Sequence, residues 1–317
     1  MRAKAPPINT EGAREPSGRS YMLGGHLFAA PKAAAGLHLV ATPIGNLGDI
    51  TLRSLETLAG VDVIACEDTR ITRRLTERYG IAAALTPYHE HNAATARPKI
   101  LQRLARAGSV ALVSDAGTPL VSDPGFKLVR EACASGYSVL ALPGPSSVLA
   151  ALSVAGLPTN RFFFEGFLPP KSTARRARLS ELARIDATLV VFESGNRLPA
   201  TLSDLADIMG AREAAVCREL TKLHEEIRRA TLSQFAEADQ IETRGEFVLV
   251  IGPQPANADV LTAEALDDLL REALLHHSVK DAVAHALELS GRPRREIYAR
   301  ALEIAKQVSA KASHDEN

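Results

Sequence analysis

Residues 37–48 read LHLVATPIGNLG, and this stretch decides the fold class that the chain is expected to adopt. The short apolar run at residues 37–41 fits a buried strand, and the Thr, Pro, Gly and Asn residues that follow fit a loop. Apolar residues then recur at helical spacing from Leu52 to Ala59. A strand, a polar loop and a helix in this order open a βαβ unit, which predicts a mostly parallel sheet.

The same alternation continues along the chain and divides it into four regions. Further strands are predicted at residues 61–65, 110–113 and 137–142, and after the linker-like GLPTN at 156–160 they follow at 162–164, 188–192, 214–217 and 247–251. Apolar residues at helical spacing then continue to the end of the chain. We therefore expect a flexible extension at 1–36, α/β domains at 37–157 and 158–256, and a helical segment at 257–317.

Composition excludes several classes of protein. With 46% hydrophobic and 23% charged residues, the 317-residue chain is typical of a soluble globular protein. The 37 basic and 37 acidic residues balance, so any nucleic-acid affinity must come from local basic patches. Only 4% of residues are aromatic, which disfavours a base-stacking sheet. No apolar run approaches the roughly 18 residues of a membrane span, and three scattered cysteines indicate buried thiols in a reducing cytoplasm.

Three loops rich in Gly and Pro follow strands of the first domain. They are TPIGNLGD at 42–49, SDAGTPLVSDPG at 114–125 and PGPSS at 143–147. Ligands of open parallel sheets bind beyond the carboxyl ends of the strands, where glycine lets the backbone approach them closely. A single such loop fits a tight turn equally well, but three at one edge favour a ligand site. Neither a G-x-G-x-x-G fingerprint nor a Walker A sequence is present, which disfavours NAD and ATP.

Several motifs in order resemble a known family. They are VATPIGNL at 40–47, CEDTR at 66–70, the 114–125 loop, YHEHN at 88–92, FEGFLP at 164–169, RELTK at 218–222 and GEFV at 245–248. Together they resemble the tetrapyrrole methylase superfamily, and more narrowly its ribosomal-RNA branch of small-subunit 2′-O-methyltransferases. The resemblance extends from residue 37 to the C-terminus. One departure is ESGNR at 193–197, where the family usually has Glu-Ser-Pro-His-Arg, so no role of that histidine is carried over.

The resemblance implies two α/β domains of tetrapyrrole-methylase type with S-adenosylmethionine between them, and a homodimer. It implies 2′-O-methylation of a decoding-centre cytidine in 16S rRNA of the small ribosomal subunit. The residues it implies for the cofactor are Pro43, Ile44, Gly45, Asp115, Ala116, Gly117, Thr118, Pro143, Gly144, Pro145, Ser146, Ser147, Phe192, Glu193 and Leu220. Asp115 and Asp123 would place negative charge near the cationic sulfur, or each would cap its own loop.

A ribose hydroxyl is a poor nucleophile until a base takes its proton. The candidates for that base are Asp68, His89 and Glu90, in polar clusters that follow the second strand and precede the next helix. A structural salt-bridge network with Arg70 or Arg73 explains them equally well. His89 and His91 flank Glu90 as metal ligands would, but no further ligand has suitable spacing, and no metal is predicted.

Basic residues are the candidates for contact with RNA phosphates. They are Arg70, a cluster of Lys171, Arg175, Arg176 and Arg178 after Pro169-Pro170, and Arg294 and Arg295 in the C-terminal segment. The cluster predicts a phosphate clamp or a solvated helix face. Arg294 and Arg295 would begin the second helix of a helix-turn-helix, although the segment could instead pack on the second domain.

Two other functions remain open. The same fold and cofactor serve carbon methylation of a tetrapyrrole, but a small anionic macrocycle requires neither the basic cluster nor the helical segment. A non-catalytic ribosome assembly factor would not need intact Gly and Pro positions in all three loops.

Overall fold

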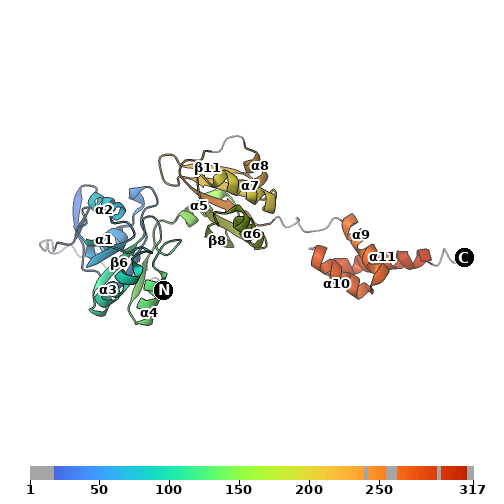
Figure 1. Ribbon diagram of the computed structural model, residues 1–317, viewed down its shortest axis with the longest axis horizontal. Coiled ribbons are helices and arrows are strands. Elements are labelled where there is room, and N and C mark those ends of the chain that lie inside the picture. Colours follow the sequence, from blue (N-terminus) through green and yellow to red (C-terminus); the bar gives the residue numbers. More distant parts are fainter. Residues whose placement is uncertain (1–17, 239–241, 255–262, 291–293, 313–317) are drawn as a thin grey trace, which may run out of the picture. The chain divides into compact units, whose positions relative to one another are not determined.

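The computed structural model describes residues 18–238, 242–254, 263–290 and 294–312. The chain forms two compact units, Met1–Gly252 and Pro253–Asn317, and the predicted boundary at 257 lies outside the described residues. Their helices and strands can be followed in Figure 1. Within the described ranges, no helix combines the length and apolarity that a bilayer crossing requires.

The first sheet is parallel throughout, as predicted. Its five strands lie in the order β5-β4-β6-β3-β7. They are β3 (Gly36–Val40), β4 (Val63–Cys66), β5 (Ala84–Pro87), β6 (Ser109–Val113) and β7 (Val139–Leu142). The sequence pattern did not predict β5, because this edge strand is only partly buried and ends in a proline.

Helices cover both faces of this sheet. Apolar residues of α1 (Leu52–Gly60) and α2 (Thr69–Arg78) pack on one face, and those of α3 (Ala93–Ala105) and α4 (Phe126–Ala134) on the other. Successive residues of β4 and β6 belong alternately to the two cores, so both strands are buried along their whole length. Sheets covered on both faces have such continuous apolar strands, which is why the sequence pattern was clear here.

The second sheet is mixed and mostly antiparallel. Its order is β11-β10-β12-β9-β8, and only β8 and β9 are parallel neighbours. The strands are β8 (Phe162–Phe167), β9 (Thr188–Ser194), β10 (Glu213–Arg218), β11 (Glu226–Thr231) and β12 (Glu246–Ile251). The second α/β region is therefore present as expected. Strand β11 was missed because its sequence, EIRRAT, carries three charged residues and no apolar run.

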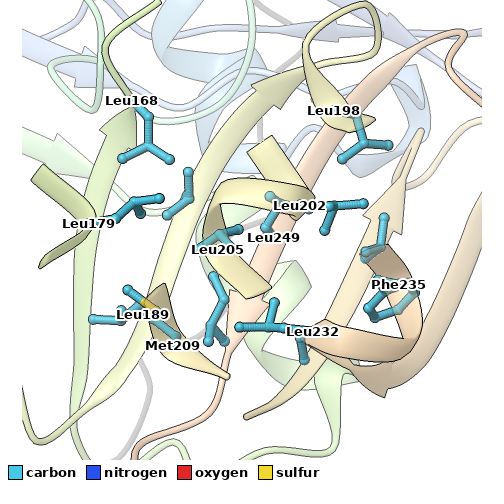
Figure 2. Packing of buried hydrophobic residues seen from close by; sticks show 14 of the residues in the cluster. Leu168, Leu179, Leu189, Leu198, Leu202, Leu205, Met209, Leu232, Phe235 and Leu249 are labelled. Atoms are coloured by element: carbon cyan, nitrogen blue, oxygen red, sulfur yellow. The ribbon is translucent and has the colours of Figure 1, made fainter. Parts of the chain in front are cut away.

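The main core of this second lobe lies between its sheet and the helices α6 (Ser172–Leu182), α7 (Leu198–Met209) and α8 (Leu232–Glu237). Figure 2 shows Leu202 and Leu205 of α7 beside Leu249 of β12. The opposite face is covered by α5 (Ser147–Ala155). The predicted boundary at 157 assigned this segment to the first domain. Its apolar residues pack instead on β10 and β12, so α5 belongs to the second lobe.

An N-terminal hairpin corrects the expectation that residues 1–36 form only a flexible extension. Strands β1 (Ser20–Leu23) and β2 (His26–Ala29) pair antiparallel across Gly24-Gly25, both at positive φ, the conformation that tight hairpins favour. The hairpin is held by an Arg19–Asp62 ion pair of 2.9 Å. The sequence had indicated only a loop here, because two adjacent glycines are equally typical of a flexible loop and of a hairpin turn. Residues 1–17 lie outside the described part of the chain.

The C-terminal unit is helical, as predicted. It consists of α9 (Ala263–His276), α10 (Val279–Ser290) and α11 (Arg294–Ala312). Leu266, Leu270, Val283 and Ile297 belong to its own buried core. Arg300 donates to Asp267 at 2.6 Å, which ties α11 to α9. Of the residues predicted to contact RNA, Arg295 is exposed, whereas the side chain of Arg294 lies outside the described residues.

Candidate functional site

A cavity of about 440 Å³ lies among the loops of the first sheet and the second lobe. This volume is within the range of small-molecule sites, about 300–1,000 Å³. Ten predicted cofactor residues line it: Ile44, Asp115, Ala116, Gly117, Thr118, Ser146, Ser147, Phe192, Glu193 and Leu220. The cavity therefore collects the three loops that sequence analysis placed at one edge of the sheet.

The other five predicted residues do not line the cavity: Pro43, Gly45, Pro143, Gly144 and Pro145. They belong to the loops that hold the lining residues. Thr42 and Gly117 exchange two backbone hydrogen bonds of 2.9 Å, and Thr118 Oγ1 donates to the carbonyl of Pro145 at 3.2 Å. The three loops are thus bonded to one another beside the cavity.

Backbone strain is concentrated on both sides of the cavity. In the 114–125 loop, the non-glycine residues Leu120 (φ 76°) and Ser122 (φ 62°) have positive φ; Ser122 lines the cavity and Leu120 precedes the lining residue Val121. In the second lobe, Glu219 (φ 49°) and Thr221 (φ 67°) flank Leu220 in the same way. A conformation that costs of order 1–3 kcal/mol per residue persists only where its surroundings enforce it, and such residues cluster at functional sites.

Carboxylates gather at the first-sheet side of the cavity. Asp115 and Asp123 line it, and the carboxylate of Asp115 accepts the backbone N–H of Asp68 at 2.9 Å. Burial raises the pKa of Asp123 to about 6; Glu67 and Asp115 raise this pKa too, while a hydrogen bond from Ser114 opposes them. Burial also raises the pKa of Glu67 and of Asp115. Asp123 is therefore a cavity carboxylate that takes up a proton close to neutral pH.

Asp68, predicted as a candidate proton acceptor, has a structural role instead. Its carboxylate caps α2 by accepting the backbone N–H of Arg70 at 2.8 Å, and it forms a 2.6 Å ion pair with the Arg70 side chain. These bonds lower the pKa of Asp68 to about 2. A carboxylate held in this way is a weak base, and it does not line the cavity. The alternative of a structural ion pair with Arg70 is the one observed.

His89 and Glu90 also lie outside the cavity lining. His89 is half-buried, its Nδ1 is buried without a hydrogen-bond partner among the described residues, and Glu90 is exposed. His89 lies close enough to Glu67 to lower that carboxyl's pKa, although burial raises it more. In the described ranges, no three His, Cys, Asp or Glu side chains are grouped so that they could hold a metal.

The second lobe contributes an anchored wall. Glu193 is buried and accepts from Thr201 Oγ1 at 2.6 Å and from the Ser194 N–H at 2.8 Å. Lys222 lines the cavity and donates to Glu219 at 2.9 Å and to Glu246 at 2.7 Å. The first lobe meets this wall at Gly45, where a Cβ would lie 2.4 Å from Lys222 Cγ. Gly45 thus makes room for the lysine chain instead of lining the cavity.

Several lining residues of the second lobe were not predicted from the sequence. Phe167, Phe247 and Val248 form apolar surface together with Phe192. The rings of Phe167 and Phe192 pack edge to face, with their centroids 5.6 Å apart. Phe167 lies in FEGFLP and Phe247 in GEFV, so the motifs were found without their place in the site. Cys217 lines the cavity, and burial raises the pKa of its thiol to about 11. Cys66 is buried as expected, but Cys133 is exposed.

The predicted phosphate clamp is internally neutralised. Arg175 is only 4% exposed and donates to Asp204 at 2.7 Å. Arg176 pairs with Asp204 and Asp207, and Arg178 with Glu165 and Glu181. The expectation that Arg175 contacts RNA is therefore wrong, since its charge joins α6 to α7. Lys171 alone of these four is exposed with no ion pair described.

Replacing Arg175 by methionine should reduce stability and leave RNA affinity unchanged. The buried Asp204 would keep Ser172 and Arg176 as partners, so we expect a loss of about 1–3 kcal/mol, below the 3–5 typical of a fully orphaned buried charge. Chemical denaturation measures this loss. Arg184→Met, at an exposed position nearby, is the control. A variant as stable as the wild type would show that the ion pair contributes nothing.

The departure at residues 193–197 has a steric reason. A Cβ on Gly195 would lie 1.6 Å from the carbonyl oxygen of Thr243, which only glycine avoids. The next residue, Asn196, accepts a 2.8 Å hydrogen bond from the Ser194 hydroxyl. The loop that contains Thr243 continues to Gly245 and Glu246, both of which line the cavity. The close approach of the segment at Thr243 therefore explains why this chain has glycine at position 195.

Residues 36–236 match the family described as tetrapyrrole (corrin/porphyrin) methylases, and residues 259–305 match the RsmI C-terminal HTH domain. The chain is 47% identical to ribosomal RNA small subunit methyltransferase I of Mesorhizobium japonicum, over 89% of this chain and 97% of that protein. It belongs to that methyltransferase I family. The resemblance identified from the motifs is thereby confirmed.

A second relative has the same name as the Mesorhizobium protein. Ribosomal RNA small subunit methyltransferase I of Escherichia coli O157:H7 is 42% identical to this chain, over 87% of this chain and 97% of the relative. Two solved structures share the fold alone, at 18% and 16% identity. The alignment with a cobalt precorrin-4 methyltransferase has a TM-score of 0.52 and covers 68% of this chain and 94% of the other. The alignment with a diphthine synthase has a TM-score of 0.55 and covers 83% of this chain and 98% of the other.

Proposed function

We propose that the chain is an S-adenosylmethionine-dependent methyltransferase of small-subunit ribosomal RNA, acting on the ribose 2′-oxygen of a decoding-centre cytidine in 16S rRNA. The observation that carries the proposal is the cavity, formed by the family's own loop motifs in a chain close in sequence to proteins named ribosomal RNA small subunit methyltransferase I. A cytoplasmic homodimer belongs to the same proposal, by resemblance to the family.

The residues of the cavity fit the proposed cofactor. S-adenosylmethionine supplies a methyl group activated by a positively charged sulfur. Carboxylates of Asp115 and Asp123 suit that charge, and Phe192, Leu220 and Val248 offer apolar surface for an adenine ring. Gly117 exchanges its backbone hydrogen bonds with Thr42, which leaves the backbone N–H groups of Ala116 and Thr118 on either side for polar atoms of the ligand.

Asp123 replaces Asp68, His89 and Glu90 as our candidate for the proton acceptor. It lines the cavity, unlike the other three, and its pKa of about 6 suits a group that must be charged at neutral pH yet still take a proton. As the 2′-oxygen is methylated, its proton would pass to the Asp123 carboxylate. Glu67 and Asp115 keep this carboxyl basic by repelling its charge.

Tetrapyrrole methylation and a non-catalytic assembly role remain as alternatives for the test. The protein is incubated with tritiated S-adenosylmethionine in three separate reactions. Each reaction contains one acceptor, which is small ribosomal subunits, free 16S rRNA or uroporphyrinogen. We expect label in the ribosomal substrates and, after nuclease digestion and mass spectrometry, in a 2′-O-methylcytidine. Label in uroporphyrinogen alone would favour the tetrapyrrole reaction, and no transfer with any substrate would favour the assembly factor.

A further inference from the structure

Helix α2, labelled in Figure 1, carries four arginines on one side. Arg70, Arg73, Arg74 and Arg78 follow the i, i+3, i+4, i+8 spacing that places residues on one helical face. All four are exposed, whereas Thr72, Leu75 and Thr76 are buried on the opposite side. We call these four residues the α2 arginine face.

The charge of this face is largely unpaired. Arg70 is bonded to Asp68, yet its side chain is 87% exposed. Arg73, Arg74 and Arg78 have no ion pair or side-chain hydrogen bond within the described part of the chain, and Glu77 is the single acid in the helix. Helix α6 differs, since Arg175, Arg176 and Arg178 are all paired. Helix α2 thus presents free positive charge, whereas the three arginines of α6 are held in ion pairs.

The position of α2 connects this charge to the cavity. The helix begins directly after Asp68, whose backbone N–H donates to the carboxylate of Asp115, a cavity-lining residue. From there its ten residues extend about 15 Å at the usual rise per residue. A chain of phosphates on either side of a nucleotide in the cavity could therefore continue along the helix.

We infer that the α2 arginine face binds the phosphate backbone of the RNA substrate beside the nucleotide held in the cavity. The inference rests on the proposed function and names the surface that would hold its substrate. Guanidinium groups bind phosphate oxygens through paired hydrogen bonds, and such contacts position RNA without reading its sequence. Asp68 holds Arg70 toward the cavity end, and the three unpaired arginines extend the contact.

The test compares two triple variants that remove equal charge from the full-length protein. Arg73→Gln/Arg74→Gln/Arg78→Gln neutralises α2, and Lys99→Gln/Arg103→Gln/Arg106→Gln removes exposed charge at and just after α3, which packs on the other face of the sheet. Glutamine keeps helix propensity close to that of arginine. Affinity for purified small ribosomal subunits and for free 16S rRNA is measured across a salt titration, alongside S-adenosylmethionine affinity by calorimetry.

We expect the α2 variant to bind RNA at least about tenfold more weakly, with the salt slope reduced by about 2–3 for three lost phosphate contacts. The α3 variant should bind like the wild type, and both should keep cofactor affinity. An α2 triple lysine variant should restore most of the RNA affinity. Equal weakening of both neutral variants, or no weakening of the α2 variant, overturns the inference. A wild-type protein that binds neither subunits nor rRNA would instead refute the proposed function.

Discussion

Asp123→Asn is expected to lower kcat for methyl transfer by about 10²–10⁴-fold, the range that a positioned general base contributes. The amide retains the size of the side chain but cannot take a proton from the ribose hydroxyl. In the wild type, kcat/KM should rise with pH through about 6, as the carboxyl of Asp123 in the free enzyme loses its proton, and then level off. Single-turnover kinetics from pH 5 to 8 with small ribosomal subunits would measure this rise of the rate with pH, and the variant should not show it.

Asp123→Asn should also stabilise the protein without ligand. The folded state raises the pKa of this carboxyl from 3.8 to about 6. The folded form therefore binds the proton more tightly, and stability is lost as pH rises from about 4 to 6. Above pH 6 the amide should increase the free energy of unfolding by about 1–3 kcal/mol. Asp49→Asn, at an exposed position, is the control. Full activity in Asp123→Asn would exclude this carboxylate as the base.

Gly195→Ala is expected to reduce the free energy of unfolding by about 2–4 kcal/mol. The new Cβ would lie 1.6 Å from a backbone oxygen, so a segment must move and cannot simply change rotamer. For a unit of this size the melting temperature should fall by roughly 5–10 °C. Because the displaced loop continues into the cavity wall, S-adenosylmethionine affinity should fall as well.

Gly210→Ala is the matched control in the same lobe. Its Cβ would meet nothing within 4 Å, although φ is +64°, so only the backbone conformation opposes alanine there. That conformation, with φ 64° and ψ −136°, is adopted almost only by glycine, and it costs alanine of order 1–3 kcal/mol. Thermal unfolding followed by circular dichroism compares the two variants. If Gly195→Ala melts no lower than Gly210→Ala, the steric reason given for ESGNR is incorrect.

The central strands β4 and β6 of the first lobe could be predicted from sequence because they are buried on both faces, whereas the partly buried edge strand β5 was missed. Continuous apolar runs such as residues 110–113 allow only one interpretation, and the loops after them were found together with their motifs. The mixed second sheet was harder. Strand β11 has two adjacent arginines and no apolar run, and its antiparallel pairing with β10 depends on contacts that no local pattern carries.

The basic residues show the same limit. Arg175 and Arg73 have similar surroundings in the sequence, each near further arginines. What separates them is tertiary: Asp204, 29 residues away, meets Arg175 in the core between α6 and α7, while no acid meets Arg73 among the described residues. Likewise, Asp123 was noticed as a charge near the cofactor, but its raised pKa depends on burial beside Glu67 and Asp115.

A calorimetric titration of the full chain with S-adenosylmethionine, compared with Ala116→Trp, tests most directly whether this cavity is the cofactor site. Ala116 lines the cavity and is exposed within the 114–125 loop, so tryptophan would fill the space without disturbing a core. Ala105→Trp, at the exposed end of α3, is the control. We predict one bound ligand per chain for the wild type and the control, and none for Ala116→Trp. Equal binding by Ala116→Trp, or none by the wild type, would contradict the assignment.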